Sequence, residues 1–195
     1  MSIVNLINEK LLNKDNPWED SPYKNLPLLT IDERGKVGEE ICSYACKTTS
    51  LVINEDITNK NAKGDNIHYD MRINGIYLEI KTAYRDSSNT WQHERIYKNS
   101  ECCDAVAFID FDYHGIYVSL FKIEDLPMQK DSPFFPRKHA TLRKNQDDGF
   151  KLDFSRRTFS NFKNRHSIYF SEEEATFENI GKFIEKELKN YVINS

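Results

Sequence analysis

Residues 69–84, YDMRINGIYLEIKTAY, constrain the fold more than any other stretch, because Asn74-Gly75 lies between two alternating runs. Asn-Gly between such runs is the strongest short-range hairpin signal, since a type I′ turn needs a positive φ at both central residues. A two-residue loop fixes the register and sends one set of apolar side chains to a core. The expected core-facing pairs are Ile73 with Ile76, Met71 with Leu78, and Tyr69 with Ile80.

The opposite face of this hairpin pairs Arg72 with Tyr77, Asp70 with Glu79, and His68 with Lys81. Directly opposed like charges destabilise a hairpin, so the two carboxylates need an explanation. One explanation is a solvated face on which water screens the pair and Lys81 neutralises part of its charge. The other is a divalent cation held between the carboxylates, because hard cations such as Mg²⁺ prefer oxygen ligands.

The remaining patterns predict helices and strands in alternation. Residues 128–165 show no clear period, although FKLDF (150–154) could form a short strand, and residues 1–34 resemble a partly helical arm. Helices are expected at 34–46, 90–99 and 171–192, the last with Ser171 as its N-cap. Strands are expected at 50–57, 104–112 and 115–123, with a helical turn at IEDLP (123–127). This order predicts an α/β fold: a mixed central β-sheet of about five strands flanked by helices.

The charge is unevenly distributed along the chain. Residues 135–165 carry 9 Lys or Arg and 3 Asp or Glu, whereas the whole chain has a net charge of −4. A basic block in an acidic protein favours a local anionic partner, and a solvated loop is the alternative. No secretory signal and no apolar run long enough to span a membrane is found, so we expect a cytoplasmic protein.

The four cysteines are Cys42, Cys46, Cys102 and Cys103, and none forms a CxxC pair. A zinc site is one possible use of them. Reduced, buried thiols fit the spacing better, because the usual ligand pattern is missing.

The order of elements, with Asp70 and Glu79-Ile80-Lys81 on one hairpin after a Glu-bearing helix, resembles the PD-(D/E)xK nuclease superfamily. The resemblance covers residues 34–123. It includes GKVGEE (35–40), which is similar to the GxxGE context of the family's helical glutamate. The Pro that names the motif is missing, because Tyr69 precedes Asp70.

The resemblance implies that Asp70, Glu79 and the Ile80 carbonyl bind Mg²⁺ and that Lys81 is the catalytic lysine. Glu39 would bind a second ion directly or through water. The motif context favours Glu39, but helical geometry places Glu40 nearer the apolar stripe. Gln92 would supply a polar side chain from the helix at 90–99, whose Trp91 we expect in the core and whose His93 we expect on the surface.

Phosphate neutralisation then gives the basic block a role. The expected DNA-binding residues are Arg137, Lys138, Arg143, Lys144, Asn145, Arg156, Arg157, Lys163 and Arg165. The sequence therefore predicts a Mg²⁺-dependent endonuclease for double-stranded DNA, of type II restriction type, acting as a homodimer on a palindromic site. A repair or junction-resolving nuclease of the same fold and a non-catalytic DNA-binding protein are the alternatives.

We expect a single nuclease domain over residues 1–195. Its core would be 34–123, its DNA-contacting region 124–170, and its C-terminal helix 171–192.

Overall fold

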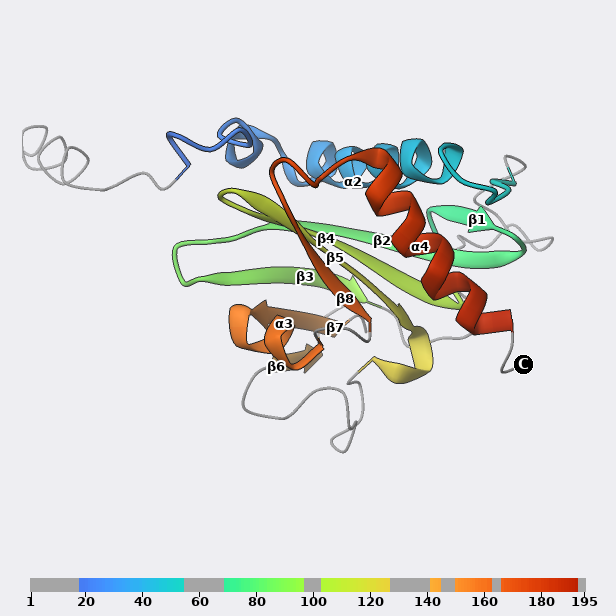
Figure 1. Ribbon diagram of the computed structural model, residues 1–195. Coiled ribbons are helices and arrows are strands. Elements are labelled where there is room, and N and C mark those ends of the chain that lie inside the picture. Colours follow the sequence, from blue (N-terminus) through green and yellow to red (C-terminus); the bar gives the residue numbers. More distant parts are fainter. Residues whose placement is uncertain are drawn as a thin grey trace, which may run out of the picture.

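The computed structural model describes residues 18–54, 69–96, 103–126, 141–144, 150–162 and 166–192. Its centre is a five-stranded sheet in the order β1-β2-β4-β5-β8 (Figure 1). Strands β2 and β4 run parallel, and the other neighbours in this sheet run antiparallel. The predicted mixed sheet of an α/β fold is therefore confirmed. The strands are β1 (Met71–Ile73), β2 (Ile76–Tyr84), β4 (Ala105–Asp112), β5 (Gly115–Lys122) and β8 (Ser167–Ser171).

The β1–β2 hairpin has the predicted turn and register as far as Met71, which pairs with Leu78. Asn74 and Gly75 have φ values of 49° and 87°, as a type I′ turn requires. Beyond Met71 the prediction is wrong. The N–H of Asp70 donates to the carbonyl of Leu78 (2.9 Å), so the alternation breaks there. Tyr69 consequently lies against Tyr77, on the other face of the sheet.

Two helices cover one face of the sheet (Figure 1): α2 (Ile31–Lys47) and α4 (Phe177–Val192). Helix α2 begins three residues before the prediction, because Thr30 and Glu33 form a capping box. Helix α4 begins six residues after the predicted N-cap. Ser171 instead ends β8, and the N–H of Asn179 donates to the hydroxyl of Thr176 (3.2 Å).

The core beneath the helices, called here the helix-covered core, is almost entirely apolar. Helix α2 contributes Cys42, Ala45 and Cys46, and α4 contributes Ile180, Ile184 and Leu188. Tyr44, on the same helix, is 50% exposed. The main strand residues of this core are Met71, Ile73, Leu78, Ile80, Ala107, Ile109, Phe111, Val118 and Leu120.

The other face of the sheet is covered by a second sheet of three strands, with α3 (Arg156–Phe162) beside it. Its strands are β3 (Thr90–Ile96), β7 (Phe150–Ser155) and β6 (Thr141–Lys144), in the order β3-β7-β6. The predicted helix at 90–99 is wrong. Trp91 and His93 are buried and alternate with exposed Gln92 and Glu94, which is the two-residue period of a strand. The short strand predicted at FKLDF is confirmed as β7.

The core between the two sheets, called here the inter-sheet core, is rich in aromatic rings. Trp91, Phe108, Phe121 and Phe154 are all fully buried in it. The predicted core position of Trp91 is confirmed. The predicted surface position of His93 is wrong, because this side chain is buried among Phe108 and Phe154.

Shorter elements complete the fold. A 3₁₀ turn, η1 (Leu26–Leu28), precedes α2, and η2 (Ile123–Asp125) forms the predicted helical turn after β5. Residues 50–54 make only an isolated bridge, between Ile53 and Ile73, and residues 55–57 of that predicted strand lie outside the described ranges. No helix in the described ranges is long and apolar enough to cross a membrane.

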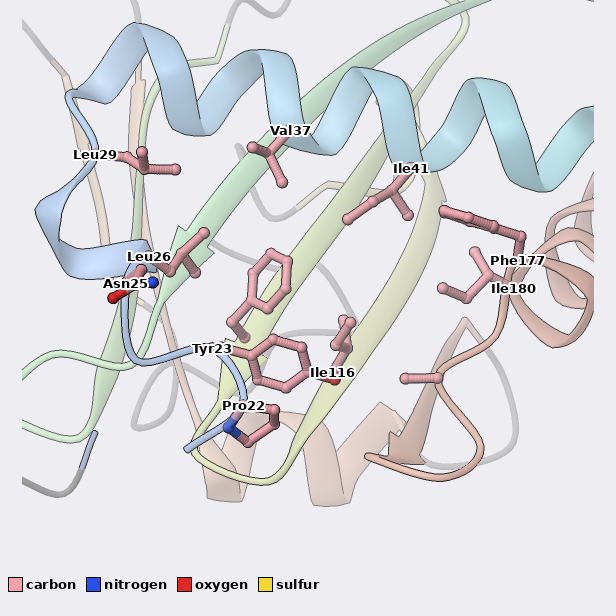
Figure 2. Close-up of a pocket in the computed structure, with 12 residues that line it drawn as sticks. Pro22, Tyr23, Asn25, Leu26, Leu29, Val37, Ile41, Ile116, Phe177 and Ile180 are labelled. Atoms are coloured by element: carbon pink, nitrogen blue, oxygen red, sulfur yellow. The ribbon is translucent and has the colours of Figure 1, made fainter. Parts of the chain in front are cut away.

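Cys42, Cys46 and Cys103 are reduced and buried, as predicted, and Cys102 lies outside the described residues. An apolar pocket of about 370 Å³ opens beside the helix-covered core, between the segment before α2, α2 itself and the start of α4 (Figure 2). Its lining includes Tyr23, Leu26, Val37, Ile41, Phe111 and Phe177.

Candidate active site

Asp70 directly precedes β1, where the pairing between β1 and β2 ends. Its carboxylate accepts the hydrogen bond that a backbone carbonyl would accept if the pairing continued. The N–H of Ile80 on β2 donates to Asp70 Oδ2 at 2.6 Å. Burial raises the pKa of Asp70, and the Ile80 N–H and the Lys81 ammonium offset only part of this effect. Asp70 is therefore not the ladder partner of Glu79 that the simple hairpin register predicted, and its carboxylate instead reaches the N–H of Ile80.

Glu79 and Lys81 lie on β2 with their side chains on the face that carries the inter-sheet core. Lys81 Nζ is 2.5 Å from Glu79 Oε1, and the two side chains are 19% and 13% exposed. Burial raises the pKa of Glu79 to about 7. The Lys81 charge acts against this shift, and the charge of Asp70 adds to it. The carboxyl groups of Asp70 and Glu79 thus interact electrostatically although they are not a cross-strand pair.

Glu39 reaches this site from α2 because Gly38 lets the helix pack closely on β2. A Cβ on Gly38 would lie 1.8 Å from Thr82 Oγ1 and 3.1 Å from Thr82 Cβ. The next residue, Glu39, is half-buried, and its pKa is raised by burial and by the charge of Asp70. Glu40 is exposed. Between the two glutamates that the sequence left open, the structure places Glu39 nearer the carboxylates.

The arrangement combines three carboxyl groups with one ammonium group, and the pKa of each carboxyl group is raised. In an antiparallel ladder a residue's N–H and C=O point toward the same neighbour, so the Ile80 carbonyl faces the edge where Asp70 lies. Two carboxylates and a backbone carbonyl, completed by water, are oxygen donors of the kind that Mg²⁺ takes. Within the described ranges no three His, Cys, Asp or Glu side chains gather as a metal site by themselves. The fit therefore depends on the carbonyl and on water.

Gln92 does not join these residues. It lies on β3, is exposed, and donates from Nε2 to Asp86 Oδ2 (2.7 Å). Asp86 follows the end of β2, seven residues beyond Glu79, which is about 20 Å along an extended strand. The expectation that Gln92 serves the carboxylate site is wrong, because the segment is a strand and not a helix.

The predicted DNA-binding residues are only partly described. Arg137, Lys138, Asn145, Lys163 and Arg165 lie outside the described residues. The backbones of Arg143 and Lys144 are in β6, and that of Arg157 is in α3. Arg156 begins α3, directly after β7, so it is held on a defined element, as predicted.

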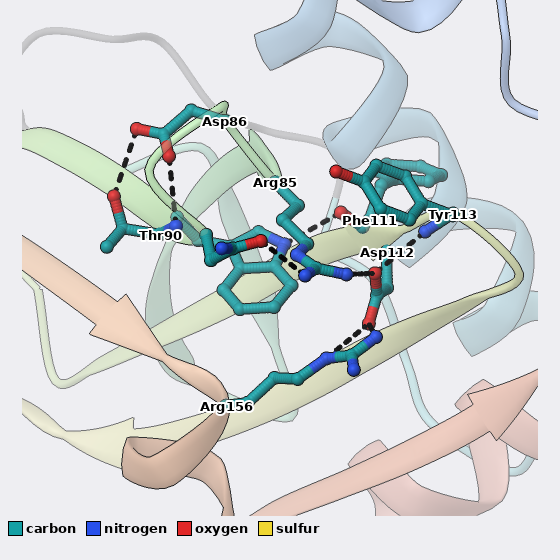
Figure 3. A network of polar contacts seen from close by, with 9 residues as sticks. Arg85, Asp86, Thr90, Phe111, Asp112, Tyr113 and Arg156 are labelled. Carbon is teal, nitrogen blue, oxygen red and sulfur yellow. Dashed lines mark hydrogen bonds and ion pairs between the residues drawn. The ribbon is translucent and has the colours of Figure 1, made fainter. Parts of the chain in front are cut away.

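Arg156 belongs to an ion-pair network that the sequence analysis did not identify (Figure 3). Asp112 Oδ2 accepts from Arg156 Nη2 at 2.9 Å, and Asp112 Oδ1 accepts from Arg85 Nη1 at 3.0 Å. Burial raises the pKa of Asp112, but the Tyr113 N–H and the two guanidinium groups outweigh burial and hold this pKa below its usual value.

A second buried pair, His93 and Asp110, also escaped the sequence analysis. His93 Nε2 is 2.9 Å from Asp110 Oδ1, with side chains 1% and 0% exposed. The signal for both aspartates was available: FIDFD places Asp110 and Asp112 two residues apart in an apolar strand, and therefore on one face. The partner of Asp110 could not be found because β3 was taken for a helix, and the partners of Asp112, Arg85 and Arg156, lie far from it along the chain.

No protein-family model matches the chain, and no curated protein sequence is similar to it. The apolar pocket is lined by none of the candidate site residues, so it is not part of this site. The geometry around Asp70, Glu79 and Lys81 is therefore the basis on which a function can be assigned.

Proposed function

We propose that this protein is a Mg²⁺-dependent endonuclease that hydrolyses phosphodiester bonds in double-stranded DNA. The observation that carries the proposal is the meeting of Asp70, Glu79 and Lys81 at one strand edge, with Glu39 brought in by α2. The same residues carry the resemblance to the PD-(D/E)xK nucleases. The restriction type and the homodimer extend this proposal, because a palindromic duplex mirrors a two-fold protein symmetry.

Asp70, Glu79 and the Ile80 carbonyl are the groups that would hold a Mg²⁺ ion. Bound Mg²⁺ supplies a water of lowered pKa and neutralises charge on the phosphate oxygens. Glu79 must lose its proton to act as a ligand, since its pKa is about 7 in the metal-free protein. Lys81 lies within hydrogen-bond distance of Glu79. Its ammonium group could orient the attacking water as a donor, or, after losing its own proton, take a proton from that water.

The test is incubation of the protein with unmethylated phage DNA, with Mg²⁺ and with EDTA. We expect discrete fragments with Mg²⁺ only. A smear would favour a repair or nonspecific nuclease of the same fold, and intact DNA of altered mobility would favour a non-catalytic DNA-binding protein. DNA that is neither cut nor shifted would overturn the proposal.

Lys81→Ala should lower the cleavage rate at least about 100-fold, the lower range for loss of a general acid or base. Binding measured with Ca²⁺ in place of Mg²⁺ should remain largely intact, because other cations hold the duplex. Lys182→Ala is the matched control, since Lys182 is an exposed cation paired with Glu178 on α4. Cleavage by the Lys81 variant at the rate of this control would remove Lys81 from the reaction.

A further inference from the structure

Asp112 holds two arginine side chains where one would neutralise it. The carboxylate is 3% exposed and lies at the end of β4. It accepts from Arg85 Nη1 and the Tyr113 N–H through Oδ1, at 3.0 and 2.9 Å. It accepts from Arg156 Nη2 and Nε through Oδ2, at 2.9 and 3.3 Å. Both oxygens are thus engaged, and the group carries one surplus positive charge in a fixed orientation (Figure 3).

Arg156 presents this surplus charge to solvent. Its side chain is 59% exposed, and it uses Nε and Nη2 for Asp112. Among the described residues no partner contacts Nη1, so that side of the guanidinium plane is available. Arg85 is fixed more tightly: its guanidinium lies 4.5 Å over the Tyr113 ring, and Nη2 donates to Asn89.

Two further tyrosines stand beside the arginine pair. The rings of Tyr117 and Tyr169 are 4.7 Å apart, and both phenol groups interact electrostatically with Asp112 and Arg156. Burial, as the largest cause, raises the pKa of both phenols, so they are neutral hydroxyl groups at pH 7. Tyr169 is 42% exposed and can donate a hydrogen bond to a ligand beside Arg156.

The nearest acids are occupied by bonds of their own. Glu174, which faces Tyr169, accepts from the hydroxyl and the N–H of Ser171. Asp86 accepts from the N–H groups of Ser88 and Thr90 and from the Thr90 hydroxyl. Among the described residues neither of these carboxylates bonds to Arg156, so the free edge of its guanidinium is open to an anion.

We propose that Arg156, held by Asp112 and backed by Arg85 and Tyr169, is a binding site for a backbone phosphate of double-stranded DNA. A planar guanidinium with two N–H groups free on one edge matches the geometry of phosphate oxygens. The choice of DNA as the polymer rests on the proposed function. Asp112 acts here as a positioning residue, since it fixes the plane of the guanidinium that contacts the phosphate.

This phosphate is not the one that is cleaved. Glu79 pairs with Val106 on β4, and Asp112 lies six residues farther along that strand on the same face. Six residues of extended strand span about 20 Å. The site would therefore fix the position of the duplex at a distance from the carboxylates.

The experiment measures binding of a duplex of about 30 base pairs, with Ca²⁺ in place of Mg²⁺, at several salt concentrations. Arg156→Ala should raise Kd roughly tenfold at low salt and lower the salt slope by about one unit. Arg156→Lys should keep the salt slope and recover part of the affinity, because it keeps the charge without the planar fork. Lys182→Ala on α4 is the control and should change neither quantity.

Asp112→Asn separates positioning from simple attraction. It adds one positive charge, so attraction alone would tighten binding, whereas loss of the fixed guanidinium plane should weaken it. Thermal melts of each variant identify conditions in which all are folded, and Kd is compared there. Unchanged Kd and salt slope in Arg156→Ala, with normal binding by the unaltered chain, would overturn this site and leave the proposed function standing. No duplex binding by the unaltered chain would overturn both.

Discussion

The two faces of the five-stranded sheet differ in what they bury. The helix-covered face presents apolar residues on every strand, such as Ile73, Leu78 and Ile109. The face toward the second sheet also has an apolar centre, but Glu79, Lys81, Asp110 and Asp112 lie on it as well. Because side chains alternate along a strand, β2 and β4 contribute to both faces at once.

The difference shows where a fold can place charge. Two amphipathic helices cover one face with continuous apolar stripes, which leave no room for an unpaired charge. The second sheet covers the other face mainly around Phe108, and four acidic or basic groups described on that face have partners. Asp110 pairs with His93, Glu79 with Lys81, and Asp112 with two arginines. In the described part of the sheet, the buried ion pairs of β2 and β4 therefore lie on the face that the helices do not cover.

The largest expected effect tests whether the two cores are independent. Phe108 contacts His93, Phe121 and Phe154 between the sheets, so Phe108→Ala should cost about 3–5 kcal/mol. Its neighbour Ile109 is buried in the helix-covered core, and Ile109→Ala should cost about 2–5 kcal/mol. Denaturant unfolding measures both losses.

Amide hydrogen exchange shows which part of the molecule each of these two variants destabilises. Phe108→Ala should reduce the protection of amides in β3 and β7 more than of those in α4, and Ile109→Ala should do the opposite. Equal loss everywhere in both variants would show that the two faces unfold as one unit.

The second prediction concerns pH. The pKa of Glu79 is raised from 4.5 to about 7 in the folded, metal-free protein. The folded state therefore binds more protons than the unfolded chain between these values, and its stability falls as pH rises from about 4.5 through 7. Glu79→Gln removes this term, so at pH 8 with EDTA the variant should be more stable by on the order of 2–3 kcal/mol.

The same comparison at about pH 3.5 or below should show almost no difference, because Glu79 is then protonated in both the folded and the unfolded state. Asp70, Glu39 and Asp110 also have raised pKa values, so part of the slope with pH persists in the variant. Melting temperatures across this range provide the measurement. A Gln variant less stable than the unaltered protein at pH 8 would mean that Glu79 stabilises the metal-free fold.

The smallest expected effect concerns the contact that brings Glu39 to the site. Gly38→Ala introduces a Cβ that meets Thr82, and it should cost about 1–3 kcal/mol as α2 moves away from β2. Gly35→Ala on the same helix has nothing within 4 Å and should stabilise by about 0.5–1 kcal/mol. We expect the melting temperature to fall in Gly38→Ala and to rise in Gly35→Ala.

Adding Thr82→Ala to Gly38→Ala removes the atom at 1.8 Å and should restore part of the loss. If Gly38→Ala proves as favourable as Gly35→Ala, close packing does not position Glu39.

The helix-covered side could be predicted from local patterns. The Asn74-Gly75 turn, the stripe of α4 and the two central strands each carry their signal within one short stretch. The N-cap of α4 was misplaced because Ser171 pairs with Gly115, a contact that no local pattern shows.

The inter-sheet side depends on partners far along the chain. Strand β3 pairs with β7, about 60 residues later, and TWQHERI alone was taken for a helix. The buried position of His93 and the contacts of Gln92 were missed for that reason, whereas the Asp112 network was missed because Arg85 and Arg156 lie far from Asp112 along the chain. Asp70, Glu79, Lys81 and Glu39 were brought together correctly because three of them lie on one hairpin and the fourth lies on a helix packed directly on it.

Each of the two cores contains at least one buried thiol, so the opening of each core can be followed separately by alkylation of its cysteines. Cys42 and Cys46 lie in the helix-covered core, and Cys103 lies in the inter-sheet core. Burial raises the pKa of Cys46 to about 12 and that of Cys42 further, and only a thiolate reacts rapidly with an alkylating reagent. With Cys102 changed to serine, the alkylation rates of Cys42 and Cys46 report how often the helices separate from the sheet. The alkylation rate of Cys103 reports how often the two sheets separate from each other.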